Sequence, residues 1–267
     1  MTVHNRREKT IECLRRLFES DRGDARLVVF LVDDKSTDGT ADAVRNVFHD
    51  VRIIQGNGSL FWNKGMDLAW KCAYKSGYYD FFLWLNDDTI LNKDGIKVLI
   101  DTYHFIPKAS IVVGSVCSTD GIRDTYGGVI KEKRVKPYGK IVKVDSFNGN
   151  IVLIPRRVCE KVGFMCSRFT HSFGDFEYGL RAKKMGVYSY ITPTYIATCD
   201  RHDGSKKCFD SKYSLKERLK YLYSPLGYPP LEFFYLNKIS RGFPAALGVL
   251  MANHVRAFMP WLWQMRK

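Results

Sequence analysis

Two groups of polar, mainly acidic residues follow apolar segments, each at the point where the segment ends. The first group is Asp33 and Asp34 after residues 27–32, and the second is Asn86, Asp87 and Asp88 after residues 81–85. Adjacent carboxylates at the end of a buried strand repel one another unless a cation lies between them. A divalent ion with oxygen ligands suits this role and, if it also holds diphosphate, offsets charge on a leaving nucleotide. Taken alone, Asp87 and Asp88 equally suit a loop cap.

A hydroxyl-rich turn follows the first acid pair. Residues 36–40 read Ser-Thr-Asp-Gly-Thr and lead into a helical segment, with Asp38 or Thr40 available as its N-cap. Such a turn can hydrogen-bond the polar edge of a base or the hydroxyls of a ribose. The chain has neither a G-x-x-x-x-G-K-[ST] phosphate loop nor a G-x-G-x-x-G motif. A nucleotide would therefore be held by side chains and a metal rather than by a glycine-rich loop.

Alternating strand and helix patterns must position these groups. Apolar runs predict strands over 27–32, 51–54 and 80–85, and helical spacing predicts helices over 8–20, 41–48 and 63–76. This order predicts a parallel sheet with crossover helices, whose ligands gather at the carboxyl ends of the strands. Both acid groups then lie at one edge. Further expected elements are strands over 111–116, 151–154 and 188–191, helices over 93–105, 156–162 and 175–185, and a basic hairpin or loop over 131–143.

Short motifs occur in a fixed order between residues 2 and 204. They are Thr2-Val3-His4-Asn5-Arg6; Val32-Asp33-Asp34 with residues 36–40, compared with D-D-x-S-x-D-G-T; Asn63-Lys64-Gly65 with Ala69, compared with N-x-G-x-x-x-A; Asn86-Asp87-Asp88 at a D-x-D position; residues 174–181, compared with E-D-x-D-L-x-x-R; and His202. In this order they resemble the family 2 glycosyltransferases, inverting enzymes that use nucleotide sugars. The resemblance implies the GT-A α/β fold, with a Rossmann-like, mostly parallel sheet flanked by helices. The chain departs from the pattern at Asn86 and Gly174, each of which replaces an acid.

The resemblance also implies a role for each matching residue. It implies Asp175 as the base that takes the proton of an acceptor hydroxyl, with Glu177 as the alternative or as a positioning group. It implies Asp88 and His202 as ligands of Mn²⁺ or Mg²⁺. The implied nucleotide-binding residues are Thr2, His4, Asn5, Arg6, Asp33, Asp34, Asn63 and Lys64. The implied donor-sugar residues are Trp62, Asn86, Asp87, Asn148, Gly149 and Asn150.

Without the resemblance, several of these residues have simpler interpretations. Asp175 and Glu177 suit the solvated first turn of a helix, where acids meet the helix dipole. His202 suits a surface histidine, and Trp62 suits core packing. We expect Arg181 to be structural, paired with acids one turn back on its own helix.

The implied function is transfer of a sugar from a UDP- or dTDP-sugar to a hydroxyl of a glycan or lipid-linked glycan, in cell-surface polysaccharide synthesis such as that of O-antigen. Trp62, Asn86 with Asp88, and residues 173–177 most resemble rhamnosyl- and galactofuranosyltransferases. A sugar nucleotidyltransferase is the nearest alternative, but we would expect it to carry a glycine-rich phosphate loop. A binding protein that has lost catalysis is another, suggested by Asn86 and Gly174. A nucleic-acid-binding protein would require a recognisable reader motif, which is absent.

The composition indicates a folded, basic protein. Its 267 residues are 45% hydrophobic and 14% aromatic, and 42 Lys and Arg outnumber 28 Asp and Glu, for a net charge of +14. We expect a catalytic domain over 1–204, with a nucleotide-sugar half over about 1–92 and an acceptor half over about 93–204, and a helical extension over 205–267. The extension is basic and aromatic and then apolar over 243–263, which suits peripheral contact with an anionic membrane. A lid or a homodimer interface is the alternative.

The cysteines and the first residues bear on location. Seven cysteines without a C-x-x-C pair predict reduced thiols and no zinc ribbon. No signal peptide precedes Thr2, and His254 and Arg256 interrupt the late apolar run. These features predict a cytoplasmic protein, with peripheral contact at the inner face of the membrane. Because the first motif begins at Thr2, we expect most of the family's usual first strand to be missing.

Overall fold

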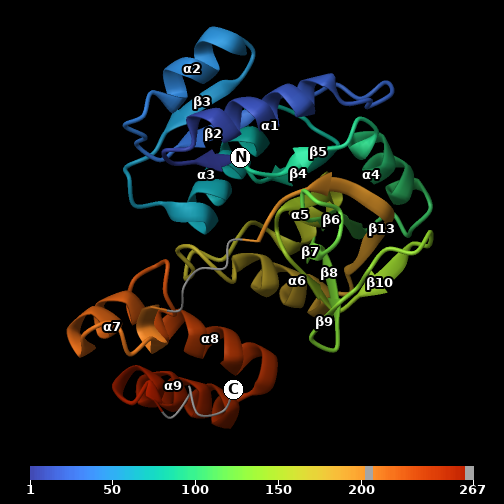
Figure 1. The fold of residues 1–267 in the computed structure, drawn as a ribbon. Coiled ribbons are helices and arrows are strands. Elements are labelled where there is room, and N and C mark those ends of the chain that lie inside the picture. Colours follow the sequence, from blue (N-terminus) through green and yellow to red (C-terminus); the bar gives the residue numbers. More distant parts are fainter. Residues whose placement is uncertain (202–206, 262–267) are drawn as a thin grey trace. The chain divides into compact units, whose positions relative to one another are not determined.

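The structure is a computed structural model that describes residues 1–201 and 207–261 (Figure 1). Contacts divide the chain into two compact units. The first comprises Met1–Ser167 and Gly174–Arg201, and the second comprises Arg168–Phe173 and the described residues from 207 onward. The second unit therefore includes a short segment from within the sequence of the first.

A parallel three-stranded sheet opens the first unit. Its elements are β1 (Thr2–Val3), α1 (Arg7–Glu19), β2 (Phe30–Asp33), α2 (Thr40–Val47), β3 (Arg52–Gln55) and α3 (Phe61–Ser76), followed by β4 (Phe81–Leu85). Strands β1 and β3 pair in parallel with β2 on its two sides, which confirms the crossover arrangement for β2 and β3. The expectation that β4 continues this parallel sheet is wrong, because β4 lies in a second sheet and its strand partner there is antiparallel.

A seven-stranded mixed sheet and a small antiparallel sheet follow in the first unit. The larger sheet has the order β10-β13-β6-β12-β4, with β5 paired to β13 and β7 to β6, and the smaller one has the order β11-β8-β9. The elements are β5 (Ile90–Leu91), α4 (Gly95–His104), β6 (Ser110–Cys117), β7 (Asp124–Tyr126), β8 (Gly128–Ile130), β9 (Lys133–Arg134), β10 (Val142–Val144), β11 (Ser146–Phe147), β12 (Ile151–Pro155), α5 (Arg156–Val162), α6 (Gly174–Lys184) and β13 (Tyr188–Thr198). Strand β6 is parallel to β13, whereas β4 is antiparallel to β12. The chain thus has the GT-A-like mixed α/β fold, but most strand pairings among the described residues are antiparallel, whereas a mostly parallel sheet was expected.

Two hydrophobic cores form because side chains alternate across the strands. On β4, Phe82 and Trp84 belong to one core and Leu85 to the other. The core around Leu85 includes Leu14 of α1, whereas the core around Trp84 includes Trp70 of α3. Buried strands that contact helices on both faces explain the continuous apolar runs in the sequence.

Two strands differ in length from the prediction. Strand β2 begins at Phe30 rather than at residue 27, and Val28 is 38% exposed. Strand β13 continues to Thr198, past the predicted end at 191. Its pairing with β6 shifts register between Ile191 and Tyr195, around Pro193, which has no N–H to donate. The predicted short strand is therefore only the first part of a longer strand that contains a bulge.

The second unit is helical. It contains a 3₁₀ turn (Lys207–Phe209), α7 (Leu215–Leu222), α8 (Pro230–Arg241) and α9 (Phe243–Phe258). A capping box between Ser214 and Glu217 begins α7, and buried Arg218 donates to the carbonyl of Ala257 (2.8 Å). The segment before α6 packs on α8, with the rings of Phe173 and Phe233 5.0 Å apart. The part of the chain that the structure describes contains no helix long and apolar enough to cross a membrane.

One apolar cavity lies apart from the polar groups of interest. It has a volume of about 130 Å³ and is lined by β2, α3 and β4, including Met66 and Trp70. None of the polar residues proposed for a site lines it.

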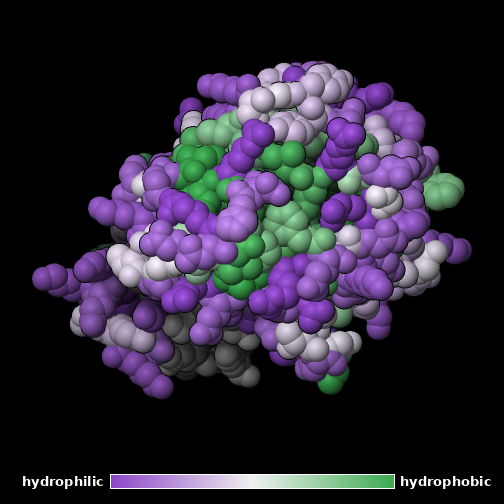
Figure 2. Space-filling model, turned by 90° about the horizontal axis from the view of Figure 1, so that it is seen from above, coloured by the Kyte–Doolittle hydropathy of each residue, from purple (hydrophilic) through white to green (hydrophobic). Residues whose placement is uncertain are grey.

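On the surface, hydrophobic residues gather in the middle of one face of the molecule, among hydrophilic ones (Figure 2).

Candidate active site

The segment that follows β1 joins the two acid groups. The ring Nδ1 of His4 lies 2.8 Å from the carbonyl oxygen of Asp34. The guanidinium of Arg6 reaches the second group, with Nη1 2.6 Å from Asp88 Oδ2 and 3.2 Å from Asp87 Oδ1. The carboxyl ends of β1, β2 and β4 therefore lie close together, as predicted for the two acid groups, although β2 and β4 belong to different sheets.

The carboxylate of Asp34 organises the loop that leads into α3. Its Oδ1 accepts the N–H of Gly58 (2.7 Å), and its Oδ2 accepts the N–H groups of Leu60 (2.9 Å) and Phe61 (3.0 Å). A Cβ at Gly56 would lie 2.6 Å from Oδ1, so only glycine fits beside the acid. Asp34 thus has a positioning role that the sequence did not predict, and its contact with a base stays a prediction.

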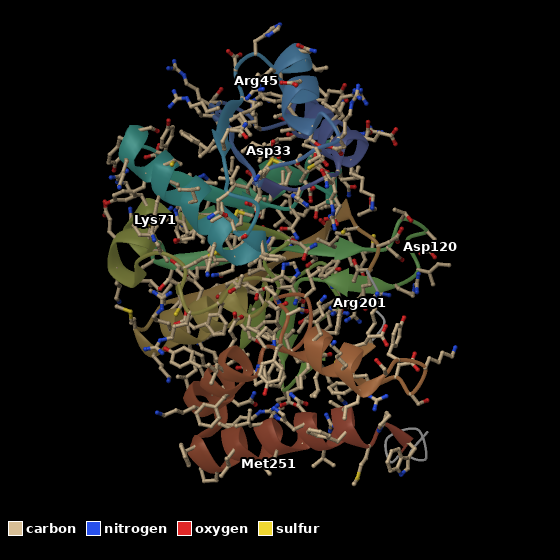
Figure 3. All side chains as sticks on the ribbon, turned by 90° about the vertical axis from the view of Figure 1, so that its left-hand side faces the viewer. Asp33, Arg45, Lys71, Asp120, Arg201 and Met251 are labelled. Carbon is tan, nitrogen blue, oxygen red and sulfur yellow. The ribbon has the colours of Figure 1, made fainter. Side chains whose placement is uncertain are left out.

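Asp33 and Asn5 hold the hydroxyl-rich turn. Asp33 is buried at the end of β2 (Figure 3), and its Oδ1 accepts the N–H of Ser36 (3.1 Å). Asn5 adopts a positive φ of 52°, accepts the N–H of Thr37 (2.7 Å) and donates its own N–H to the Ser36 hydroxyl (2.9 Å). The turn is therefore fixed against the end of β1 by residues predicted to bind nucleotide.

Trp62 and Asn86 form one hydrogen-bonded pair. The indole Nε1 of Trp62 donates to Asn86 Oδ1 (2.6 Å), and the backbone N–H of Asn86 donates to the carbonyl of Asn150 (2.9 Å). A Cβ at Gly149 would lie 2.6 Å from the Trp62 ring. Residues of α3, of the end of β4 and of the loop before β12 are thus brought together, as the donor-sugar prediction requires.

Asp175 lies beside this pair at the start of α6. Its Oδ2 accepts the N–H of Gly149 (2.7 Å) and its Oδ1 the N–H of Phe176 (2.9 Å). Burial raises the pKa of this carboxyl to about 6, and the two hydrogen bonds only partly oppose that rise. Each oxygen keeps an acceptor position. The carboxyl is therefore mostly ionised at neutral pH, and its pKa lies close to that pH, as is expected of a general base.

Glu177 is engaged elsewhere. Arg181 contacts both of its oxygens, from Nε (2.8 Å) and from Nη2 (3.0 Å), and also donates to the carbonyl of Phe164 (2.7 Å). The expected pairing of Arg181 one turn back is confirmed. This clamp ties α6 to the turn after α5, so the geometry favours Asp175 over Glu177 as the proton acceptor.

Close packing explains why Gly174 replaces an acid. A Cβ at Gly174 would lie 1.6 Å from Asn63 Oδ1, and the Asn63 amide donates to the carbonyl of Cys166 (3.0 Å). A Cβ at Gly65 would lie 2.1 Å from the Thr2 hydroxyl. Two predicted nucleotide-binding residues, Asn63 and Thr2, thus also set how closely α3 approaches its neighbours.

The remaining predicted residues of the first unit lie around the same edge. Lys64 is half-buried in the first turn of α3. Asn148 has a buried Oδ1 that accepts no hydrogen bond from the residues the structure describes. Asn150 is buried, with its amide 3.5 Å from the Thr89 hydroxyl. His202 lies outside the described residues.

The acids after β4 suit a hard divalent cation. Asp87 Oδ2 is buried and unpartnered within residues 1–201 and 207–261, and burial raises the pKa of Asp87 to about 6 although Arg6 opposes the rise. Carboxylate oxygens are ligands for Mg²⁺ and similar ions, which often need only one or two of them besides substrate phosphates. Among the described residues no cluster of three or more His, Cys, Asp or Glu forms a metal cage. Asp87 and Asp88 therefore fit an ion that also receives ligands from a bound diphosphate.

Two cysteines near these acids were not identified from the sequence. Cys13 of α1 donates its thiol to the carbonyls of Asn86 (3.3 Å) and Thr89 (3.2 Å), and Cys199 Sγ lies 3.6 Å from Asp88 Oδ1. Burial raises the pKa of both thiols, so they act as neutral packing groups. No spacing pattern marks them in the sequence.

Backbone strain also gathers here. Asn5, Lys35, Phe61 and Phe173 adopt positive φ values although none is glycine. Asn5, Lys35 and Phe61 each directly precede or follow a residue predicted for the site, and Phe173 lies two residues before Asp175, whereas Lys131 and Glu132 adopt positive φ values away from the site. Such conformations cost about 1–3 kcal/mol and persist at functional sites where the surroundings hold them in place. The absence of glycine hid these turns from sequence analysis.

Comparison with known proteins identifies the family of the chain. Residues 1–169 match the sequence model of glycosyl transferase family 2. The chain belongs to this family. The matched region includes both acid groups of this chain, at residues 33–34 and 86–88, and ends before Asp175 and Glu177. Comparison with curated protein sequences gives no match.

Solved glycosyltransferase structures share the fold at low identity. A mannosyltransferase, PcManGT from Pyrobaculum calidifontis, with GDP-Man and Mn²⁺, is 17% identical with a TM-score of 0.52, covering 95% of this chain and 73% of that chain. S. aureus TarS is 14% identical with a TM-score of 0.58, covering 90% of this chain and 42% of its own. GalNAc-T7 with UDP, GalNAc and Mn²⁺ is 10% identical with a TM-score of 0.56, covering 95% and 56%. This family 2 chain spans about half the length of the last two.

Replacing Gly149 by Ala tests the close packing of the site. The added Cβ would lie 2.6 Å from the Trp62 ring and 3.1 Å from Asp175 Cβ. We expect overpacking to lower the free energy of unfolding by about 1–3 kcal/mol and to shift tryptophan fluorescence. Gly248→Ala is the matched control, since an added Cβ there meets no atom within 4 Å. Equal stability and fluorescence of Gly149→Ala and the wild type would contradict the packing described.

Proposed function

We propose that the protein is an inverting, metal-dependent glycosyltransferase that transfers a sugar from a nucleoside-diphosphate sugar to an acceptor hydroxyl. The observation that carries the proposal is the position of Asp175, a buried carboxyl with a pKa of about 6 beside the Trp62–Asn86 pair. Asp87 and Asp88 supply acids for a diphosphate-bound cation at the same sheet edge. The structures of PcManGT and GalNAc-T7 hold Mn²⁺ with GDP-Man or with UDP and GalNAc, which supports this combination.

The reaction would be a single displacement. Asp175 takes the proton of the acceptor hydroxyl while that oxygen attacks the anomeric carbon and the bond from this carbon to the diphosphate oxygen breaks. The electron pair of the broken bond leaves with the nucleoside diphosphate, and the sugar inverts its configuration. Gly149 and Phe176 orient the base through their N–H groups. A divalent cation, when bound, supplies positive charge at the leaving diphosphate.

Each remaining residue has a place in this proposal. Asp88 and His202 would hold Mn²⁺ or Mg²⁺, and Asp87, expected at the donor sugar, would be a further ligand of the ion. Base, ribose and diphosphate would contact Thr2, His4, Asn5, Arg6, Asp33, Asp34, Asn63 and Lys64. Trp62 would provide an apolar wall for the donor sugar, and polar contacts to this sugar would come from Asn86, Asn148, Gly149 and Asn150.

The finer assignment rests on motif resemblance. We propose a UDP- or dTDP-linked donor of the rhamnosyl or galactofuranosyl type, and a glycan or lipid-linked glycan acceptor in the synthesis of a cell-surface polysaccharide such as O-antigen. The transfer reaction would take place at the cytoplasmic face of a membrane. The catalytic domain would end near residue 204, and residues 205–267 would form an extension that contacts lipid.

The surface of α9 supports lipid contact. Phe243, Leu247, Met251 and Val255 recur every fourth residue and are between 44% and 58% exposed, so they form an apolar row (Met251 is labelled in Figure 3). Exposed basic residues occur just before this row, at Lys238 and Arg241 near the end of α8. An apolar row with adjacent positive charge is typical of helices that lie in an anionic membrane interface.

Replacing Asp175 by Asn tests the role of the base. The change keeps the volume and removes the ionisable group, so we expect transfer to fall by about 10²–10⁴-fold. Donor binding should remain within about threefold of wild type, because Asp175 acts on the acceptor. Release of nucleoside diphosphate from UDP-, dTDP- and GDP-sugars with a lipid-linked acceptor fraction measures transfer, and calorimetry measures binding. Exposed Asp101→Asn, on α4, is the control.

The pH profile gives a second measurement of the same role. Wild-type kcat should fall about tenfold per pH unit below the pKa of Asp175, near 6, and level off above it. Near-normal turnover by Asp175→Asn would exclude Asp175 as the base. Donor binding without transfer by the wild type would instead favour a binding protein.

Changing the α9 row tests lipid contact. We expect the wild type to float with vesicles of phosphatidylglycerol and phosphatidylcholine, less in high salt, and not with phosphatidylcholine alone. The double change Leu247→Glu with Met251→Glu should weaken this partition by at least about tenfold, since each side chain contributes about 1.5–3 kcal/mol when buried. Val47→Glu, which changes an exposed residue of α2, is the control. Equal flotation of the double variant, or a dimer that the double change dissociates without any vesicle binding, would contradict the proposal.

A further inference from the structure

Arg6 lies where positive charge for the acids after β4 is required. One terminal nitrogen of its guanidinium contacts both Asp88 (2.6 Å) and Asp87 (3.2 Å). The side chain of Asp87 is 8% exposed and that of Asp88 is 10% exposed, whereas the side chain of Arg6 is 38% exposed. A guanidinium keeps its charge at every accessible pH. Arg6 therefore acts as a counter-ion of the two acids, and part of its side chain remains accessible to solvent.

The backbone fixes the point from which Arg6 reaches the acids. The preceding residue, Asn5, adopts a positive φ of 52° and is hydrogen-bonded to the turn at Ser36 and Thr37. The Arg6 carbonyl accepts the N–H of Thr10 in the first turn of α1. The arginine backbone is thus held on both sides while its long side chain remains able to change rotamer.

Arg6 does not satisfy the acids completely. Asp87 Oδ2 is buried and accepts no hydrogen bond within the described residues. In the ion pairs of residues 1–201 and 207–261, one guanidinium faces both carboxylates through a single nitrogen. A divalent cation would balance two carboxylates, but it would compete with Arg6 for the same oxygens.

We propose that Arg6 couples metal binding to donor binding: it occupies Asp87 and Asp88 when no donor is bound, and transfers to the donor diphosphate when a divalent cation takes its place. The proposal rests on the proposed function, because it requires a diphosphate ligand. A metal ion alone must displace a guanidinium that then has no anionic partner. A diphosphate provides that partner, since guanidinium groups bind phosphate and carboxylate oxygens with the same forked geometry. Arg6 would therefore disfavour metal without donor and favour the two together.

The test measures Mn²⁺ binding directly, without turnover. Free Mn²⁺ is quantified by electron paramagnetic resonance for wild type, Arg6→Gln and the control Arg7→Gln, which changes the adjacent exposed arginine. Each protein is titrated with Mn²⁺ alone and then with Mn²⁺ in the presence of UDP, dTDP or GDP. Thermal unfolding confirms that each variant is folded.

We expect nucleoside diphosphate to increase the Mn²⁺ affinity of the wild type at least about tenfold. Arg6→Gln should bind Mn²⁺ alone about three- to tenfold more tightly than wild type, because the competing charge is gone, and should lose most of the coupling. Arg7→Gln should behave as wild type. Arg6→Lys retains a charge without the fork and should fall between wild type and Arg6→Gln.

The outcomes separate this proposal from the proposed function. If Arg6→Gln and Arg6→Lys bind Mn²⁺ alone no more tightly than a wild type that does bind nucleotide with metal, the coupling role of Arg6 is wrong and the proposed function stands. If neither wild type nor variants bind any of the three nucleotides with or without Mn²⁺, the proposed function fails and the coupling fails with it.

Discussion

Buried carboxylates at one edge of the sheets are the constraint on which the rest of this site depends. Asp33, Asp34, Asp87 and Asp175 are each at most 9% exposed. An ionised carboxylate loses its hydration on burial, which costs several kcal/mol unless hydrogen bonds or a cation replace the water. The loops after β1, β2, β3 and β11 supply those replacements. Their strained or glycine-dependent backbones follow from this requirement.

The kind of compensation determines what each acid can do. Three backbone N–H groups hold Asp34, so it shapes the loop before α3. Two such groups hold Asp175 and leave its pKa near 6, in the range that suits proton transfer at neutral pH. The flexible side chain of Arg6 forms ion pairs with both Asp87 and Asp88. These buried acids thus share one physical problem, the loss of hydration, and differ in the groups that compensate for it.

Local pattern predicted most of the elements, and long-range pairing limited the rest. The apolar run before Asn86 correctly predicted β4, but its pairing with β12 depends on residues more than sixty positions away. The extension of β13 past Pro193 depends on β6 in the same way. Propensity and periodicity carry no information about such partners.

The sequence indicated which residues to consider for the candidate site, but not which residues they contact. Asn86 was interpreted as a lost acid, yet it is the acceptor of the Trp62 indole. Gly174 was interpreted likewise, yet any side chain there would collide with Asn63. The departure at Gly174 therefore has a packing reason, and Asn86 has a hydrogen-bond partner, that only the three-dimensional structure reveals. His202, predicted as a metal ligand, lies outside the described residues.

The central claim is that this edge binds a nucleoside diphosphate together with a divalent cation, next to the base Asp175. The most direct measurement is the thermal unfolding of the protein with UDP, dTDP and GDP, each with Mn²⁺ and with a chelator. At least one nucleotide should raise the unfolding midpoint only when Mn²⁺ is present, since a ligand at a hundred times its Kd adds about 2.7 kcal/mol of stability. No stabilisation by any nucleotide, or equal stabilisation in chelator, would contradict the claim.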